Sequence, residues 1–307
     1  MKSLQKVLAL SVSALALAAP AQAQVDQAPA YLIKGSKAAK VWLKDATKKA
    51  VRYTTKKGAV NFKDERLASV KVYFLQPDEF TEAMLAYQSR DYAGAQKKFG
   101  ECVKAYKRFE EVQGNYSTLA RFYEMECARK QDNLTALGSM MSKFISKPLV
   151  NEDHRLQIEI NEVFWDAVKK KAWSRLIAVA EDPKWQDRKL PGSIRAQIAY
   201  VTGLSYEAEE KTLKALNAYN RAFTADFAAS EVIARKAALA CFRMLDRHEA
   251  TKLAKKLYGT DDYSDRSEGA FYLKEGAALI SLWDKSLGGG KPLPAEYNYF
   301  KKFAKKS

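Results

Sequence analysis

The residues that most often hold a metal or act as a nucleophile are few in this chain, which has two histidines and three cysteines. His154 and His248 are far apart, and neither has a cysteine or a second histidine at ligand spacing. Each lies in or near an expected helix start or inter-helix turn. The sequence therefore predicts no metal site, no catalytic histidine and no cofactor.

Other patterns that carry catalysis are also sparse. The glycine run Gly288 to Gly290 neither follows a strand nor opens a helix, as a phosphate-binding loop must. No serine lies in a nucleophile-elbow motif. The acidic stretches Glu207–Glu210 and Glu110–Glu111 have the spacing of a solvated helix face. We therefore expect a protein that is not an enzyme.

The three cysteines, Cys102, Cys127 and Cys241, each lie within an amphipathic helical pattern. Their odd number excludes complete pairing within one chain. One interpretation is that they are small buried residues at helix contacts. The other is a disulfide, for which Cys102 and Cys127 are the pair to test because they would lie on adjacent helices.

Residues 1–23 are typical of a secretory signal peptide. Lys2 and Lys6 give a basic start, an apolar run spans 7–19, and Pro20-Ala21-Gln22-Ala23 supplies a small-x-small cleavage site. The apolar run is shorter than the roughly 18 residues of a transmembrane helix. We expect cleavage near Ala23, a periplasmic or secreted chain, and no transmembrane segment after cleavage.

The chain is strongly basic, with 52 Lys and Arg against 36 Asp and Glu and a formal net charge of +16. Removing Lys2 and Lys6 leaves +14. Export argues against a nucleic-acid partner, which leaves anionic lipid head groups, lipopolysaccharide, acidic cell-wall polymers or an acidic protein. The 47% of hydrophobic residues is enough to build a large core in one or two domains.

Two segments precede the helical part of the chain. Residues 24–39 contain Gln, Pro, Ala and Gly without periodicity, and we expect a flexible lead-in there. Residues 40–75 contain short runs of β-branched and aromatic residues, with turn chemistry at 56–58 and 63–65. This pattern predicts a small antiparallel β module of three or four strands at 41–43, 50–54, 59–62 and 70–74.

Such a small sheet is marginally stable by itself. We therefore expect its apolar face, including Trp42, Tyr53 and Phe62, to pack against the first helices. The alternative is an independent docking or oligomerising module.

The region from residue 76 to Tyr258 has helical spacing, and its clearest unit spans 197–227. Thr202-Gly203-Leu204-Ser205-Tyr206 is followed by Ala215-Leu216-x-x-Tyr219-x-x-Ala222-Phe223. This unit resembles the tetratricopeptide repeat, whose Leu-Gly-x-x-Tyr on the first helix precedes Ala-x-x-x-Phe and a further Ala on the second. The unit departs from the family pattern at three positions. Thr202 replaces the leucine, Tyr219 replaces the phenylalanine, and Phe227 replaces the closing proline.

The second-helix signature recurs along the chain with anchors at Ala95, Ala136, Leu176, Ala215 and Ala250. The anchors are separated by 41, 40, 39 and 35 residues, whereas the family unit has about 34. An irregular helical bundle is the alternative. The resemblance implies that small and large residues interlock between helices at Ala95, Phe99, Ala136, Gly203, Tyr206, Ala215, Tyr219, Ala222 and Ala250.

The resemblance covers residues 76–258 and implies a mainly α fold: a right-handed superhelical stack of about five helical hairpins after the β module. Residues 259–307 would add a C-terminal capping helix and a basic tail, with Asp265-x-x-Glu268 capping the helix. The tail lysines would solvate its exposed side, and contact with an anionic surface is the alternative. These lysines are Lys301, Lys302, Lys305 and Lys306.

This resemblance implies a scaffold that binds a protein or peptide partner through a groove. Members of the family act in envelope, pilus or secretion assembly. The groove is lined by the first helix of each hairpin, which corresponds to Tyr87, Arg121, Asn161, Trp165, Tyr200 and Arg235. Aromatic and arginine side chains commonly anchor interfaces, although Trp165 and Tyr200 could instead fill gaps between helices.

The alternative function is binding of an anionic cell-envelope polymer or lipid by the basic surface. Polyanion binding would weaken steeply with ionic strength, whereas peptide binding in a groove would largely survive.

Overall fold

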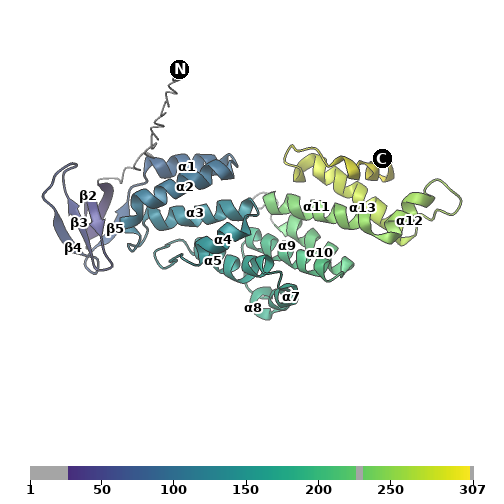
Figure 1. Cartoon of the computed structure of the whole chain (residues 1–307), viewed down its shortest axis with the longest axis horizontal. Helices are drawn as coiled ribbons and strands as arrows, with labels where there is room; N and C mark the ends of the chain where they lie inside the picture. Colours follow the sequence, from purple (N-terminus) through teal and green to yellow (C-terminus); the bar gives the residue numbers. More distant parts are fainter. Residues whose placement is uncertain (1–26, 226–230, 305–307) are drawn as a thin grey trace, which may run out of the picture.

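The computed structural model describes residues 27–225 and 231–304. A five-stranded antiparallel sheet is followed by a mainly helical region in which adjacent helices pack in pairs (Figure 1). The molecule is elongated, with the sheet at one end and α11 to α13 at the other. The expected signal peptide with its cleavage site near Ala23, the closing residue Phe227, and Lys305 and Lys306 lie outside the described residues.

The sheet has the strand order β4-β3-β2-β1-β5, and all neighbouring strands are antiparallel. Its inner face packs against the first three helices in one hydrophobic cluster. The strands are β1 (Ala28–Lys34), β2 (Lys37–Ala46), β3 (Ala50–Thr54), β4 (Lys63–Arg66) and β5 (Lys71–Phe74).

The expectation of a flexible lead-in over 24–39 is wrong from Ala28 onward. Strand β1 lies inside the sheet, between β2 and β5, and buries Ala28, Ala30 and Leu32 on one face. Two of these three side chains are alanines, so the period-2 pattern of the strand is weak in the sequence. The sheet therefore begins twelve residues earlier than predicted and has five strands.

The predicted strand at 59–62 and the predicted turn at 63–65 are also wrong. Residues 59–62 form no strand, whereas Lys63–Arg66 forms β4 at the sheet edge. Charge pairs help to hold β4: Arg52 Nε on the adjacent strand β3 lies 3.2 Å from Asp64 Oδ1, and Lys34 Nζ on β1 lies 3.2 Å from Glu65 Oε1. Such cross-strand pairs offset the low β-propensity of charged residues.

Trp42 does not pack against the helices as expected. Its neighbours Val41 and Leu43 are buried on the inner face, and side chains alternate along a strand, so Trp42 lies on the outer face. Tyr53 does contact the inner cluster.

The helical region begins with α1 immediately after Pro77. Several helices start at an Asp or Asn whose side chain accepts a hydrogen bond from the first turn, as at Asp91, Asn115 and Asn133. The helices are α1 (Asp78–Gln88), α2 (Tyr92–Tyr106), α3 (Tyr116–Lys130), α4 (Leu134–Met141), α5 (Glu152–Ile160), α6 (Asp166–Lys169), α7 (Trp173–Glu181), α8 (Pro183–Gln186), α9 (Gly192–Ala208), α10 (Thr212–Ala225), α11 (Glu231–Arg247), α12 (Glu249–Leu257) and α13 (Glu268–Leu282).

Most consecutive helices pack against each other, as α1 does with α2, α2 with α3 and α9 with α10. The five anchor positions lie on α2, α4, α7, α10 and α12. The residues expected to interlock are placed as follows: Ala95, Phe99, Gly203, Tyr206, Ala215, Tyr219 and Ala222 are buried, and Ala136 and Ala250 are half-buried.

The C-terminal part closes the array. Ser267 caps α13 by accepting from the Ala270 N–H at 3.2 Å, so the predicted capping role of Asp265 is wrong. The 3-10 helix η4 (Ala295–Phe303) then packs on α13. Phe300 is fully buried beside Gly276, where an added Cβ atom would lie 2.2 Å from its ring. This part of the predicted tail is thus an integral layer of the fold.

Candidate functional site

Three of the six predicted groove residues lie in or beside one buried polar cluster that joins α5 and the helical turn Asn161–Trp165 to α9. Gln157 Nε2 donates to Asn161 Oδ1 and to Gln197 Oε1, both at 3.0 Å. Trp165 Nε1 also donates to Gln197 Oε1, at 2.9 Å. Tyr200 lies beside Trp165, with ring centroids 6.3 Å apart. Asn161 and Trp165 are each 2% exposed, so both mainly fill space between helices.

A buried ion pair adjoins this cluster. Arg129 donates to both carboxylate oxygens of Glu126, at 2.9 and 2.6 Å, and its guanidinium lies 5.7 Å from the ring of Trp165. Burial by itself would raise the pKa of Glu126, but the charge and hydrogen bonds of Arg129 outweigh burial and lower that pKa. The pair is therefore charged and internal to the stack.

The other three predicted residues are dispersed. Tyr87 packs at the α1 end, where Lys130 Nζ lies 5.6 Å from its ring. Arg121 is half-exposed and paired with Glu124 at 2.5 Å, and Arg235 is half-buried on α11. Arg121 lines two pockets, and neither of them includes Trp165 or Tyr200. The pocket that Trp165 lines includes none of Tyr87, Arg121 and Arg235.

The cysteines and histidines have structural surroundings. Cys102 and Cys127 do lie on adjacent helices, α2 and α3, but all three cysteines are free and buried, so the possible disulfide is not formed in this structure. His154 stacks on Phe122 with centroids 4.3 Å apart. Across residues 27–225 and 231–304, no group of three His, Cys, Asp or Glu side chains could hold a metal ion.

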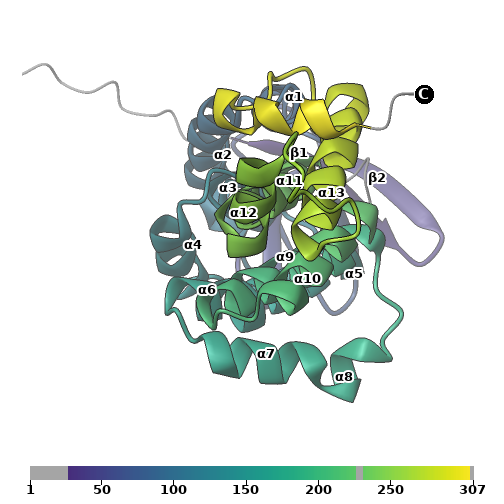
Figure 2. The ribbon, with the colours of Figure 1, turned by 90° about the vertical axis from the view of Figure 1, so that its right-hand side faces the viewer.

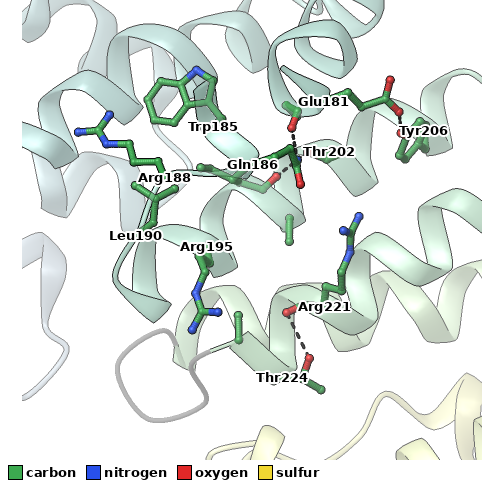
Figure 3. A pocket seen from close by; sticks show the side chains of 14 residues that line it. Glu181, Trp185, Gln186, Arg188, Leu190, Arg195, Thr202, Tyr206, Arg221 and Thr224 are labelled. Carbon is green, nitrogen blue, oxygen red and sulfur yellow. Dashed lines mark hydrogen bonds between the residues drawn. The ribbon is translucent and has the colours of Figure 1, made fainter. Parts of the chain in front are cut away.

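A pocket that the sequence analysis did not anticipate lies between α7, α8, α9 and α10 (Figure 3). Its volume is about 630 Å³. Three arginines, Arg188, Arg195 and Arg221, line it together with one acidic residue, Glu181. We call this site the arginine pocket.

Local capping builds the wall of the arginine pocket formed by α8. Asp182 accepts from the Lys184 N–H at 2.8 Å, and Pro183 follows at the first helical position, which favours a helix start. The short α8 buries Trp185 against Phe164, with centroids 5.0 Å apart. Helices α7 and α8 lie at the outer edge of the array (Figure 2).

Two sides of the arginine pocket are held in place. Arg188 lies 5.3 Å from the Trp185 ring centroid, and its Nη1 is 2.8 Å from Glu159 Oε2. On another side, the Tyr206 hydroxyl donates to the Glu181 carboxylate. Burial, followed by this hydrogen bond, raises the pKa of Tyr206 to about 12, so its hydroxyl remains protonated at neutral pH.

The remaining two arginines are exposed and come from neighbouring helices. Arg195 lies on α9 and Arg221 on α10, below the Trp185 side of the pocket in Figure 3. Neither has an ion pair with a residue in the described part of the chain. Guanidinium groups bind carboxylates and phosphates through two parallel N–H donors. The pocket can therefore hold an anionic group, with Ile198, Ala199 and Leu190 offering apolar contact.

The sequence gives little signal for this pocket. Arg188 follows a short helix, whereas Arg195 and Arg221 lie on two further helices, so no spacing within one element connects the three. Only the packing of α7 and α10 against α9, with α8 packed on α7, brings them to one opening.

Comparisons with known protein families, with curated proteins and with solved structures found no match for this chain. No helix in the described ranges is both long and apolar enough to cross a membrane.

Proposed function

We propose that this chain is an exported, non-enzymatic scaffold that binds a protein partner through a right-handed stack of about five hairpins similar to tetratricopeptide repeats. The order of the packed helices supports this proposal. In this proposal each hairpin has a first and a second helix, and the anchor residue lies on the second. The five hairpins are α1 with α2, α3 with α4, the segment from α5 to α6 with α7, α9 with α10, and α11 with α12. Stacks of this kind commonly present binding surfaces along the array.

The observation that carries the proposal is the arginine pocket. It opens between consecutive hairpins and offers two exposed guanidinium groups, on Arg195 and Arg221, that form no ion pair with a described residue. Arg188 is held beside the buried Trp185, which limits the entropy lost when a partner binds. We infer that an acidic segment of the partner binds here, through a side-chain or terminal carboxylate.

Photo-crosslinking in cells tests this proposal. A crosslinking amino acid at Gln186, an exposed residue that lines the pocket, should give a defined protein adduct. The same amino acid at Thr135, which is exposed on α4 outside the pocket, should not give that adduct. Recovery of glycan or lipid at Gln186 without any protein would overturn the proposal.

Charge reversal gives the matched control. The variant Arg195→Glu/Arg221→Glu should lower affinity for the crosslinked partner at least tenfold, because each guanidinium contributes a charged hydrogen bond to the bound carboxylate. The variant Arg175→Glu/Arg266→Glu makes the same change in net charge at exposed positions that do not line the pocket. Equal losses in the two variants would show that net charge, and not the pocket, binds the partner.

A further inference from the structure

The positive charge of the chain is concentrated in the sheet. Residues 28–75 contain twelve Lys and Arg against three Asp and Glu, a net charge of +9, whereas the whole chain of 307 residues has +16. Eleven of these twelve basic residues are exposed, and Lys44 is half-buried. A charge density of this kind creates a strong local positive potential.

The outer face of the sheet combines part of this charge with aromatic side chains. Tyr31 on β1 pairs directly with Tyr73 on β5 and with Lys40 on β2. Tyr31 and Tyr73 are 38% and 54% exposed, which is high for aromatic residues. Next to Tyr31 on the same face, Ile33 pairs with Lys71. The outer face is defined here by Tyr31, Tyr73, Trp42, Lys40 and Lys71.

Few carboxylates neutralise the outer face. Lys40 and Lys71 have no ion pair with a described residue, and Lys40 Nζ lies 5.7 Å from the ring of Trp42. The three acidic residues of the sheet region instead pair with Lys34 and Arg52. Lys40 and Lys71 thus remain available to external anions.

The fold leaves this face uncovered. The inner face of the sheet packs on the first helices, so the outer face points away from the helical region at one end of the elongated molecule (Figure 1). A planar partner could contact the sheet end while the helical array extends away from it. Helices α7 to α10, which line the arginine pocket, lie away from the sheet in Figure 1, so the pocket would stay accessible.

We propose that the outer face of the sheet docks on an anionic phospholipid bilayer. Tyr and Trp rings are favoured at the level of lipid head groups, where the ring is buried and its polar atom stays hydrated. Lysines around them attract anionic head groups while their alkyl stems cover apolar surface. A sheet face at the end of the molecule matches a planar surface. The inference is independent of the proposed partner site.

Vesicle co-sedimentation tests this inference with the chain lacking residues 1–23, so that the apolar run 7–19 cannot insert. The protein should bind vesicles with 30% phosphatidylglycerol in phosphatidylcholine at low ionic strength and should bind pure phosphatidylcholine much more weakly. Each lysine near such a surface strengthens binding about fivefold. The variant Lys40→Gln/Lys71→Gln should therefore weaken binding about thirty-fold.

The matched control is Lys301→Gln/Lys302→Gln, which removes the same charge from exposed positions on η4 and should change binding less than about threefold. The variant Tyr31→Ser/Tyr73→Ser, which keeps the charge, should also weaken binding. Circular dichroism checks that each variant is folded. Equal effects of the two lysine pairs, equal binding to both vesicle types, or no binding to anionic vesicles would overturn the inference. Binding to lipopolysaccharide without binding to phospholipid vesicles would also overturn it.

Discussion

A Cβ atom added at Gly203 would lie 2.5 Å from ring carbons of Tyr219, so the backbone of α9 touches the Tyr219 ring on α10. Cβ atoms in proteins essentially never come so close to another heavy atom. The Tyr219 hydroxyl in turn donates to Glu207 on α9 at 2.6 Å, and Glu207 accepts from Arg243 on α11 at 2.7 and 3.0 Å. One small residue therefore allows the close packing that connects three helices.

We predict that Gly203→Ala destabilises the fold. Overpacking of a tight contact costs about 1–3 kcal/mol, which exceeds the gain of about 1 kcal/mol expected when alanine replaces glycine in a helix. The matched control is Gly100→Ala on α2, where the new Cβ would meet only Glu124 at an ordinary 3.4 Å. Urea unfolding should show a lower midpoint for the first variant and an equal or higher midpoint for the second. The reverse order would contradict the packing described.

The buried pair of Glu126 and Arg129 should behave as a unit. Glu126→Gln leaves the Arg129 charge buried without its partner and should cost about 3–5 kcal/mol of unfolding free energy. The double variant Glu126→Leu/Arg129→Met should lose less than this single variant. Glu249→Gln is the control, because Glu249 pairs with Lys252 at the same spacing but in an exposed position. If the losses of unfolding free energy caused by single substitutions at 126 and 129 added up to the loss in the double variant, the two residues would not be coupled.

The protonation of His154 should make stability depend on pH. Burial, opposed by the charges of Glu126 and Asp153, lowers the pKa of His154 from its usual 6.5. Below about 6.5 the unfolded chain binds a proton that the folded chain does not, so stability falls as pH drops toward the folded pKa. Urea midpoints at pH 7.5 and 5.5 should therefore differ less in His154→Gln than in the original chain. An unchanged difference would contradict this assignment.

The three cysteines should be unreactive in the folded chain. Burial raises the pKa of Cys102, Cys127 and Cys241 to about 12, so little thiolate forms at neutral pH. Iodoacetamide at pH 8 should add no group to the native chain and three groups after denaturation, as measured by intact mass. A peptide containing Cys102 linked to Cys127 in a non-reduced digest would contradict the free thiols of this structure.

Much of the helical pattern could be predicted from the sequence. The anchors that recur at nearly regular spacing, from Ala95 to Ala250, all lie on helices that pack against a neighbouring helix. The start of the sheet could not be predicted, since β1 buries Ala28 and Ala30, whose small side chains give a weak strand signal. The charged sequence of β4 is typical of a turn, so the strand could not be predicted. Its ion pairs with Arg52 and Lys34, which stabilise the strand, come from other parts of the sheet.

The sequence by itself determined the mainly helical composition and the basic charge, because these depend on residue type and local period. Tertiary structure decided which side chains meet. It buried Asn161 and Trp165, which the family pattern placed in a groove, and it brought Arg188, Arg195 and Arg221 from separate elements to one pocket. Such meetings depend on how distant elements pack, and no spacing along one helix or strand records that packing.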